Sequence, residues 1–222
     1  MTADRAIDGA GVLLLHGVAR TSASMRALER ALAAAGHRVL NLDYRSRHLP
    51  LDALAEAIHP AVSRFAAATP GALHVVAHSM GGLLARVYLA RHRPARLGRV
   101  VMLGTPNNGS EVADLMRTWP PYRLVFGPAG QQLVTRQTDD LKAALGTVDY
   151  GLGILAGDRP LNPFAAALLL PGPNDGKVTV ASTRLAGMAD HRVIRTSHTR
   201  LASHPEAIAA ALRFLRDGTF GP

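Results

Sequence analysis

The chain of 222 residues contains no cysteine. Disulfide bonds, thiolate metal sites and a cysteine nucleophile are therefore excluded. A domain of this size folds without bridges in either redox environment, so the absence says little about compartment. Lysine is almost as scarce. Lys142 and Lys177 are the only two, and the formal net charge of +9 therefore comes almost wholly from arginine.

Long apolar runs are also lacking. The longest clean run, residues 164–170, is far shorter than a membrane-spanning helix requires, so we expect no membrane span. The first ten residues include Asp4, Arg5 and Asp8 and lack the basic-then-apolar pattern of a signal peptide. We therefore expect a cytoplasmic protein, with a secreted one as the alternative if a leader has been removed.

The arginines are mostly scattered and are not interleaved with aromatic side chains. Their densest group, within residues 91–99, falls where a helix is expected to end, and cations are favoured at helix C-termini. We interpret the positive charge as solvated surface and expect no nucleic-acid partner. A protein that binds nucleic acid or an anionic surface through its charge is the alternative.

Short apolar runs alternate with longer helical patterns, which is typical of a parallel sheet with crossover helices. The runs are rich in Val, Leu and Ile, as expected for strands covered on both faces. We expect a single domain over residues 1–222. Strands are expected at residues 12–16, 39–42, 73–77, 99–103, 152–156 and 192–196. Helices are expected at residues 24–35, 51–67, 80–91 and 204–216.

Proline and large apolar residues mark two further features. Pro60 lies inside the second expected helix and should kink or divide it. A short insert at about residues 107–150, expected to be irregular, contains Trp119 and Phe126 among other large apolar residues. Such side chains are costly to leave in water unless they cover or line a groove. We expect Trp119 and Phe126 to bind substrate, with packing of a surface helix onto the core as the alternative.

The segment Ala77-His78-Ser79-Met80-Gly81-Gly82 joins an apolar strand directly to a helical pattern. This is the strand–turn–helix context of a nucleophile elbow, whose sharp turn requires small neighbours. Gly81 and Gly82 meet that need after the serine, and Ala77 stands where glycine is more common. We therefore expect Ser79 to be a nucleophile, with a simple helix cap as the alternative.

The first expected strand ends in Leu14-Leu15-His16-Gly17-Val18. In a site built on a nucleophile elbow, one oxyanion donor is the amide after the nucleophile, and the other comes from the loop after this strand. We therefore expect the backbone N–H groups of Val18 and Met80 to form an oxyanion hole. His16 precedes the serine in the chain, and we interpret it as a hydrogen-bonding support for the loop.

The general base is expected in the loop after the last strand, since that end of the sheet faces the serine. His198 lies in this loop, and its competitors are His204 and His191.

The acid is expected between the serine and the base in the chain. Asp175 is followed by Val178 and Val180, which can anchor its loop, whereas Asp158 would be an exposed turn residue. Position favours Asp175 and leaves Asp158 open.

Together these segments resemble the small bacterial lipases and esterases of the α/β-hydrolase superfamily, in that family's order, over residues 12–214. The segments are His16-Gly17-Val18 with Arg20, residues 77–82, residues 104–110, Asn174-Asp175-Gly176 and Ser197-His198. The resemblance implies a compact α/β-hydrolase fold with about six mostly parallel strands flanked by helices. The first two strands of the usual fold should be missing, because few residues precede Val12. The resemblance also favours Asp175, since such lipases carry the acid in an Asn-Asp-Gly segment followed by valines.

The resemblance implies hydrolysis of a carboxylic ester, in a small molecule or a lipid, through an acyl-enzyme on Ser79 supported by Asp175 and His198. An acyltransferase or a thioesterase with the same triad is the alternative, and a non-enzymatic binding module on the same scaffold is another. The reaction requires no cofactor and no metal. The spacing of Asp158 and Asp190 gives no indication of a calcium site, and the sequence does not indicate an oligomeric state.

Overall fold

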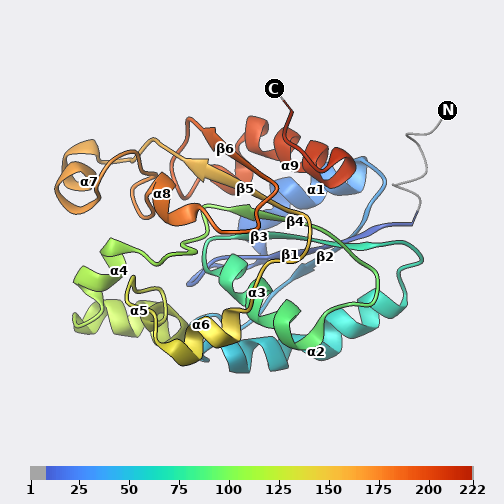
Figure 1. Cartoon of the computed structure of the whole chain (residues 1–222), viewed down its shortest axis with the longest axis horizontal. Helices are drawn as coiled ribbons and strands as arrows, with labels where there is room; N and C mark the ends of the chain where they lie inside the picture. The colour runs from blue at the N-terminus through green and yellow to red at the C-terminus, as the bar shows by residue number, and fades with distance from the viewer. Residues whose placement is uncertain (1–8, 222) are drawn as a thin grey trace.

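A single parallel sheet forms the centre of the molecule in the computed structural model, which describes residues 9–221 except the side chains of residues 165, 167 and 168 (Figure 1). Its six strands run in the order β2-β1-β3-β4-β5-β6, and every neighbouring pair is parallel. They are β1 (Gly11–Leu15), β2 (Arg38–Leu42), β3 (Leu73–His78), β4 (Leu97–Leu103), β5 (Leu152–Gly157) and β6 (Asp190–Ile194). The expected fold class is confirmed.

Each expected strand is present with its ends moved by no more than two residues. Within the described residues no strand precedes β1. The N-terminal stretch considered for a leader lies outside the described residues, apart from Gly9 and Ala10. No helix in residues 9–221 has the length and apolar character needed to cross a membrane.

Helices cover both faces of the sheet (Figure 1). On one face, α2 (Leu51–Ala67) and α3 (Met80–His92) bury Leu54, Ile58 and Leu84 against β1 and β3. On the other, α1 (Arg26–Ala34) and α9 (Pro205–Asp217) bury Leu28 and Phe214 against a second cluster. Each strand therefore packs apolar side chains in both directions, which explains why its sequence shows little alternation.

The helix α2 runs unbroken from Leu51 to Ala67 across Pro60, so Pro60 does not divide the helix, and the expected kink stays a prediction. Proline removes one backbone hydrogen bond from the interior of a helix. Pro60 lies on the exposed side of α2, where water can satisfy the carbonyl left without a donor. The cost is therefore small enough for the apolar stripe to keep the helix intact.

The stretch between β4 and β5 was expected to be irregular and is instead largely helical. It contains α4 (Glu111–Met116), α5 (Pro120–Gln131) and α6 (Asp139–Leu145). The hydroxyls of Ser110 and Thr138 accept hydrogen bonds from the first turns of α4 and α6 and so cap them. Pro120 and Pro121 lie in the first turn of α5, where a missing N–H costs nothing. Gly127, with φ of 60°, interrupts α5.

The parallel register brings two loops of the site together. Leu15 at the end of β1 lies opposite Ala77 near the end of β3, so the loop after β1 runs beside the turn after β3. Two short helices, α7 (Pro163–Leu169) and α8 (Val180–Thr183), lie in the connection from β5 to β6. The loops that follow β4, β5 and β6 reach the same carboxyl edge of the sheet, which is where open α/β sheets place their sites.

Candidate active site

Ser79 occupies a sharp turn between β3 and α3. Its backbone has φ of 57° and ψ of −129°, a combination that residues other than glycine rarely adopt. The turn is held by its own hydrogen bonds, from the Ser79 amide to the Leu103 carbonyl at 2.8 Å and from the Gly82 amide to the Ser79 carbonyl at 3.0 Å. Strained residues of this kind cluster at functional sites, because the surrounding structure must hold them in place.

Glycine allows the backbones around Ser79 to approach closely. A Cβ atom on Gly81 would lie 2.5 Å from the Leu15 carbonyl oxygen, and one on Gly82 would lie 2.0 Å from the Thr105 hydroxyl. On the other side of the turn, a Cβ atom on Gly17 would lie 3.2 Å from the Cβ of Ser79. The small residues after the serine therefore let α3 start directly against β1.

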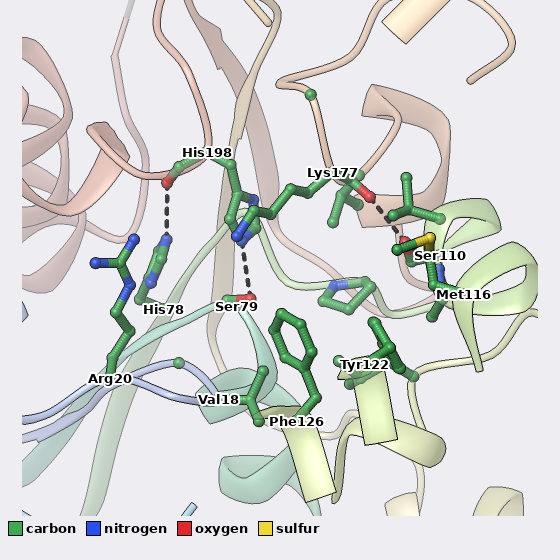
Figure 2. Close-up of a pocket in the computed structure, with 17 residues that line it drawn as sticks. Val18, Arg20, His78, Ser79, Ser110, Met116, Tyr122, Phe126, Lys177 and His198 are labelled. Carbon is green, nitrogen blue, oxygen red and sulfur yellow. Dashed lines mark hydrogen bonds between the residues drawn. The ribbon is translucent and has the colours of Figure 1, made fainter. Parts of the chain in front are cut away.

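His198 lies between Ser79 and Asp175. Its Nε2 is 2.9 Å from the Ser79 Oγ (dashed line in Figure 2), and its Nδ1 is 2.7 Å from Oδ2 of Asp175. An ionised carboxylate only accepts hydrogen bonds, so the proton of the neutral ring belongs on Nδ1 and Nε2 accepts from the serine hydroxyl. All three residues are buried. The structure thus brings together the three residues that the sequence predicted.

The Asp175 loop is fixed by backbone hydrogen bonds. Oδ1 of Asp175 accepts from the amides of Lys177 and Val178, at 3.0 and 2.9 Å, which leaves Oδ2 for His198. The His198 amide also donates to the Asp175 carbonyl at 3.0 Å, so main chain and side chain both tie the two loops. Val178 is buried, as expected for an anchor of the loop, whereas Val180 is only half-buried.

The competing residues take no part in the hydrogen bonds that join Ser79, His198 and Asp175. Asp158 is half-buried rather than exposed as expected, its amide donates to the Ile194 carbonyl, and its carboxylate is not a hydrogen-bond partner of His198. His191 lies 2.9 Å from the Thr183 hydroxyl through its Nε2. His204 is the N-terminal cap residue of α9. None of these three side chains reaches Ser79 in the described structure.

His78 is a site residue that the sequence analysis did not identify. Its Nε2 donates to the backbone carbonyl of His198 at 3.0 Å (Figure 2). Burial lowers the pKa of His78 to about 3, so the ring is neutral at neutral pH. The bond joins residues 120 positions apart in the sequence, and no local pattern could reveal it.

The loop after β1 lies beside the same turn, since a Cβ atom on Gly17 would lie 3.2 Å from the Cβ of Ser79. Val18 lines the cavity at Ser79, and Met80 is the first residue of α3. Within residues 9–221 neither of their N–H groups donates to a protein acceptor. His16 supports the loop, since its Nδ1 lies 2.9 Å from the Gly17 carbonyl and its ring stacks on Tyr44 with centroids 4.0 Å apart.

An apolar cavity of about 260 Å³ opens at Ser79 and His198 (Figure 2). Its apolar lining includes Val18, Met116, Tyr122, Phe126, Leu133 and Val178. Phe126 therefore lies where the sequence placed it, at the edge of a cavity.

Trp119 does not line this cavity in the described structure, and its expected contact with substrate stays a prediction. It is the N-terminal cap residue of α5, in extended conformation, and 53% of it is exposed. Its side chain therefore does not continue the stripe that Tyr122 and Phe126 form on α5.

Among the described residues, no group of three or more His, Asp or Glu side chains is arranged to hold a metal ion.

Comparisons with known proteins bear on the fold. A lipase from Bacillus licheniformis, BlEst2 in its mature form, has a TM-score of 0.73 at 20% identity over 95% of this chain and 91% of that one. Phospholipase PlaB from Legionella pneumophila has a TM-score of 0.72 at 19% identity, and the match covers 95% of this chain and 60% of that one. A thermophilic esterase from Thermogutta terrifontis has a TM-score of 0.59 at 17% identity, and the match covers 95% of this chain and 90% of that one. No curated protein sequence matches. At these identities the likeness shows the fold alone.

The sequence model of one family, described as alpha/beta hydrolase fold, matches residues 12–128. The match covers more than half of the chain and contains both the loop after β1 and the turn at Ser79. The sheet order, the strained serine between β3 and α3, and this match agree. The chain belongs to the α/β-hydrolase fold family.

Proposed function

We propose that the chain is a carboxylic ester hydrolase that forms an acyl-enzyme on Ser79. The observation that carries the proposal is the continuous line of hydrogen bonds from the Ser79 hydroxyl through His198 to Asp175, at 2.9 and 2.7 Å. A nucleophile whose base is itself oriented by a third group is the arrangement that activates a serine. The names of the similar structures, a lipase, a phospholipase and an esterase, support an ester substrate.

In the proposed reaction His198 removes the hydroxyl proton as the Ser79 Oγ bonds to the ester carbonyl carbon. The carbonyl oxygen becomes an oxyanion, and the amides of Val18 and Met80 donate to it. The bond to the alcohol oxygen then breaks, and the alcohol leaves with the proton from Nε2 of His198. A water molecule attacks the acyl-enzyme with His198 again acting as base, which releases the acid and restores the serine.

Asp175 and His78 hold His198 in position in this scheme. The Asp175 carboxylate keeps the proton on Nδ1 and stabilises the imidazolium that forms when Nε2 takes the serine proton. His78 holds the backbone of the same histidine through its carbonyl. Because burial lowers the pKa of His78 to about 3, that ring adds no positive charge to oppose the imidazolium.

The apolar cavity is proposed to hold the acyl chain. Met116, Tyr122 and Phe126 form a wall next to Ser79, and such a wall favours a hydrocarbon group over a polar one. The substrate class is therefore an ester, in a small molecule or a lipid, with an apolar acyl part.

The Ser79→Ala variant should fold normally and lose hydrolysis of p-nitrophenyl esters by about 10⁴-fold or more, because the covalent route disappears. The measurement is kcat/KM of purified wild-type and variant proteins, with thermal melting as the control for folding. A variant that keeps more than a few per cent of the wild-type rate would contradict the proposal.

The Asp175→Asn variant should lose about 10²–10⁴-fold in kcat, because an amide neither fixes the histidine tautomer nor stabilises the imidazolium. The matched control is Asp158→Asn, which removes the same charge from a carboxylate that does not contact His198. Its effect should be mild. Steady-state kinetics of both variants decide the point, and the reverse ranking would transfer the role to Asp158.

The Phe126→Ala variant should lower kcat/KM for octanoate or longer esters by roughly tenfold and change acetate hydrolysis little, because a buried aromatic contact is lost only for the longer chain. A panel of p-nitrophenyl esters of increasing acyl length measures this ratio. Equal losses on all chain lengths, or a lowered melting temperature, would place Phe126 in the core rather than in the acyl site.

A further inference from the structure

Large exposed apolar side chains are concentrated in two segments of the chain. The described residues include eight of them, and seven fall within residues 115–125 and 161–169. The seven are Leu115, Trp119, Leu124, Val125, Leu161, Phe164 and Leu169, with exposed fractions between 42% and 84%. The eighth, Val193, lies on β6. In Figure 1 the helices of the two segments, α4, α5 and α7, lie at the same end of the molecule. We call these seven residues the apolar rim.

The inner sides of the two stretches that carry the apolar rim, residues 115–127 and 159–170, flank the candidate active site. Met116 and Phe126 line the cavity at Ser79. Ala166 and Leu170, both buried, line a second hollow of about 220 Å³ that also contacts His198. Each segment thus turns one side toward the site and the other toward solvent. A body that covered the apolar rim would also lie over the entrance to the site.

Within the two stretches that carry the apolar rim the charged residues are arginines, whereas the half-buried Glu111, Asp114 and Asp158 lie just outside them. Residues 115–127 contain Arg117 and Arg123 and no acidic residue, and residues 159–170 contain Arg159 and no acidic residue. All three arginines are exposed. They take part in none of the ion pairs of the described residues. Their charge is therefore available to an anionic partner.

The apolar rim and its unpaired arginines suit the two regions of a lipid surface, the acyl boundary and the anionic headgroups. Apolar side chains enter the boundary of the acyl region, and arginines meet anionic headgroups. Tryptophan is favoured at that boundary because its ring is apolar and its N–H is polar.

We propose that the apolar rim docks on an anionic lipid surface and places the entrance of the site against it. This inference rests on the proposed ester hydrolase function and deepens it, since it assigns the substrate to esters held in a lipid layer. It also gives Trp119, which lies outside the acyl cavity, a place in the function.

The test uses the Ser79→Ala protein, so that ester lipids stay intact during the binding measurement. Vesicles of phosphatidylcholine with about one-third phosphatidylglycerol are compared with vesicles of phosphatidylcholine alone, by cosedimentation at low and high salt. Binding to the anionic vesicles should be at least about tenfold tighter and should weaken with salt. Trp119 is the only tryptophan in the chain, so its emission reports on this face alone. The emission should shift to shorter wavelength on binding.

Substitutions at the apolar rim should weaken this binding. In the Ser79→Ala protein, Leu124→Ser and Phe164→Ser should each weaken it by about tenfold, because each removes a large apolar side chain that enters the lipid. The matched control Val193→Ser, at the exposed residue outside the rim, should leave it unchanged. Arg123→Ala should cost about fivefold. The exposed Arg64 on α2 supplies its control, Arg64→Ala.

Three outcomes would overturn the proposal. One is equal binding of the rim variants and their controls, and another is tryptophan emission that does not change with vesicles. The third is sedimentation that shows a dimer which Leu124→Ser dissociates, since the rim would then be covered by a second copy. Hydrolysis of a soluble, monomeric ester is measured separately on proteins with Ser79 intact. Hydrolysis without vesicle binding contradicts the docking alone, and binding without hydrolysis contradicts the ester hydrolase function alone.

Discussion

The close approach of α3 to the end of β1 is the contact on which the site depends. It requires a backbone conformation at Ser79, with φ of 57°, that residues other than glycine rarely adopt. The approach is feasible because Gly81 has no Cβ, where one would lie 2.5 Å from the Leu15 carbonyl. Strain of this kind persists only where surrounding structure fixes it. Here the hydrogen bond from the Ser79 amide to Leu103 on the neighbouring β4 helps to do so.

The rest of the site follows from the order of the strands. Because β5 lies next to β4 and β6 next to β5, the loops after them reach the carboxyl edge of the sheet on the same side of the serine. The Asp175 loop and the His198 loop are then joined twice, through a side chain and through the main chain. These two hydrogen bonds fix the positions of Asp175 and His198 before substrate binds. A general base must be held in position in this way.

Much of this arrangement could be predicted from the sequence, because its signals are local. Apolar runs give the strands, and the turn at Ser79 is encoded by the glycines that follow it. The role of Asp175 could be weighed against Asp158 from the valines after it. The helical character of residues 107–150 was missed, since single caps at Ser110 and Thr138 are weak signals. The direction of Trp119 and the bond from His78 to His198 depend on tertiary contacts that no spacing reveals.

The central claim is that Ser79 is a nucleophile activated by its neighbours. Treatment with a fluorophosphonate followed by peptide mass spectrometry tests this most directly, since the reagent bonds to an activated serine and does not depend on the natural ester. We expect one phosphonyl group per chain, on the peptide that contains Ser79, and slow or absent labelling in the His198→Ala protein. Labelling of another residue, or none in the folded wild-type protein, would contradict the account.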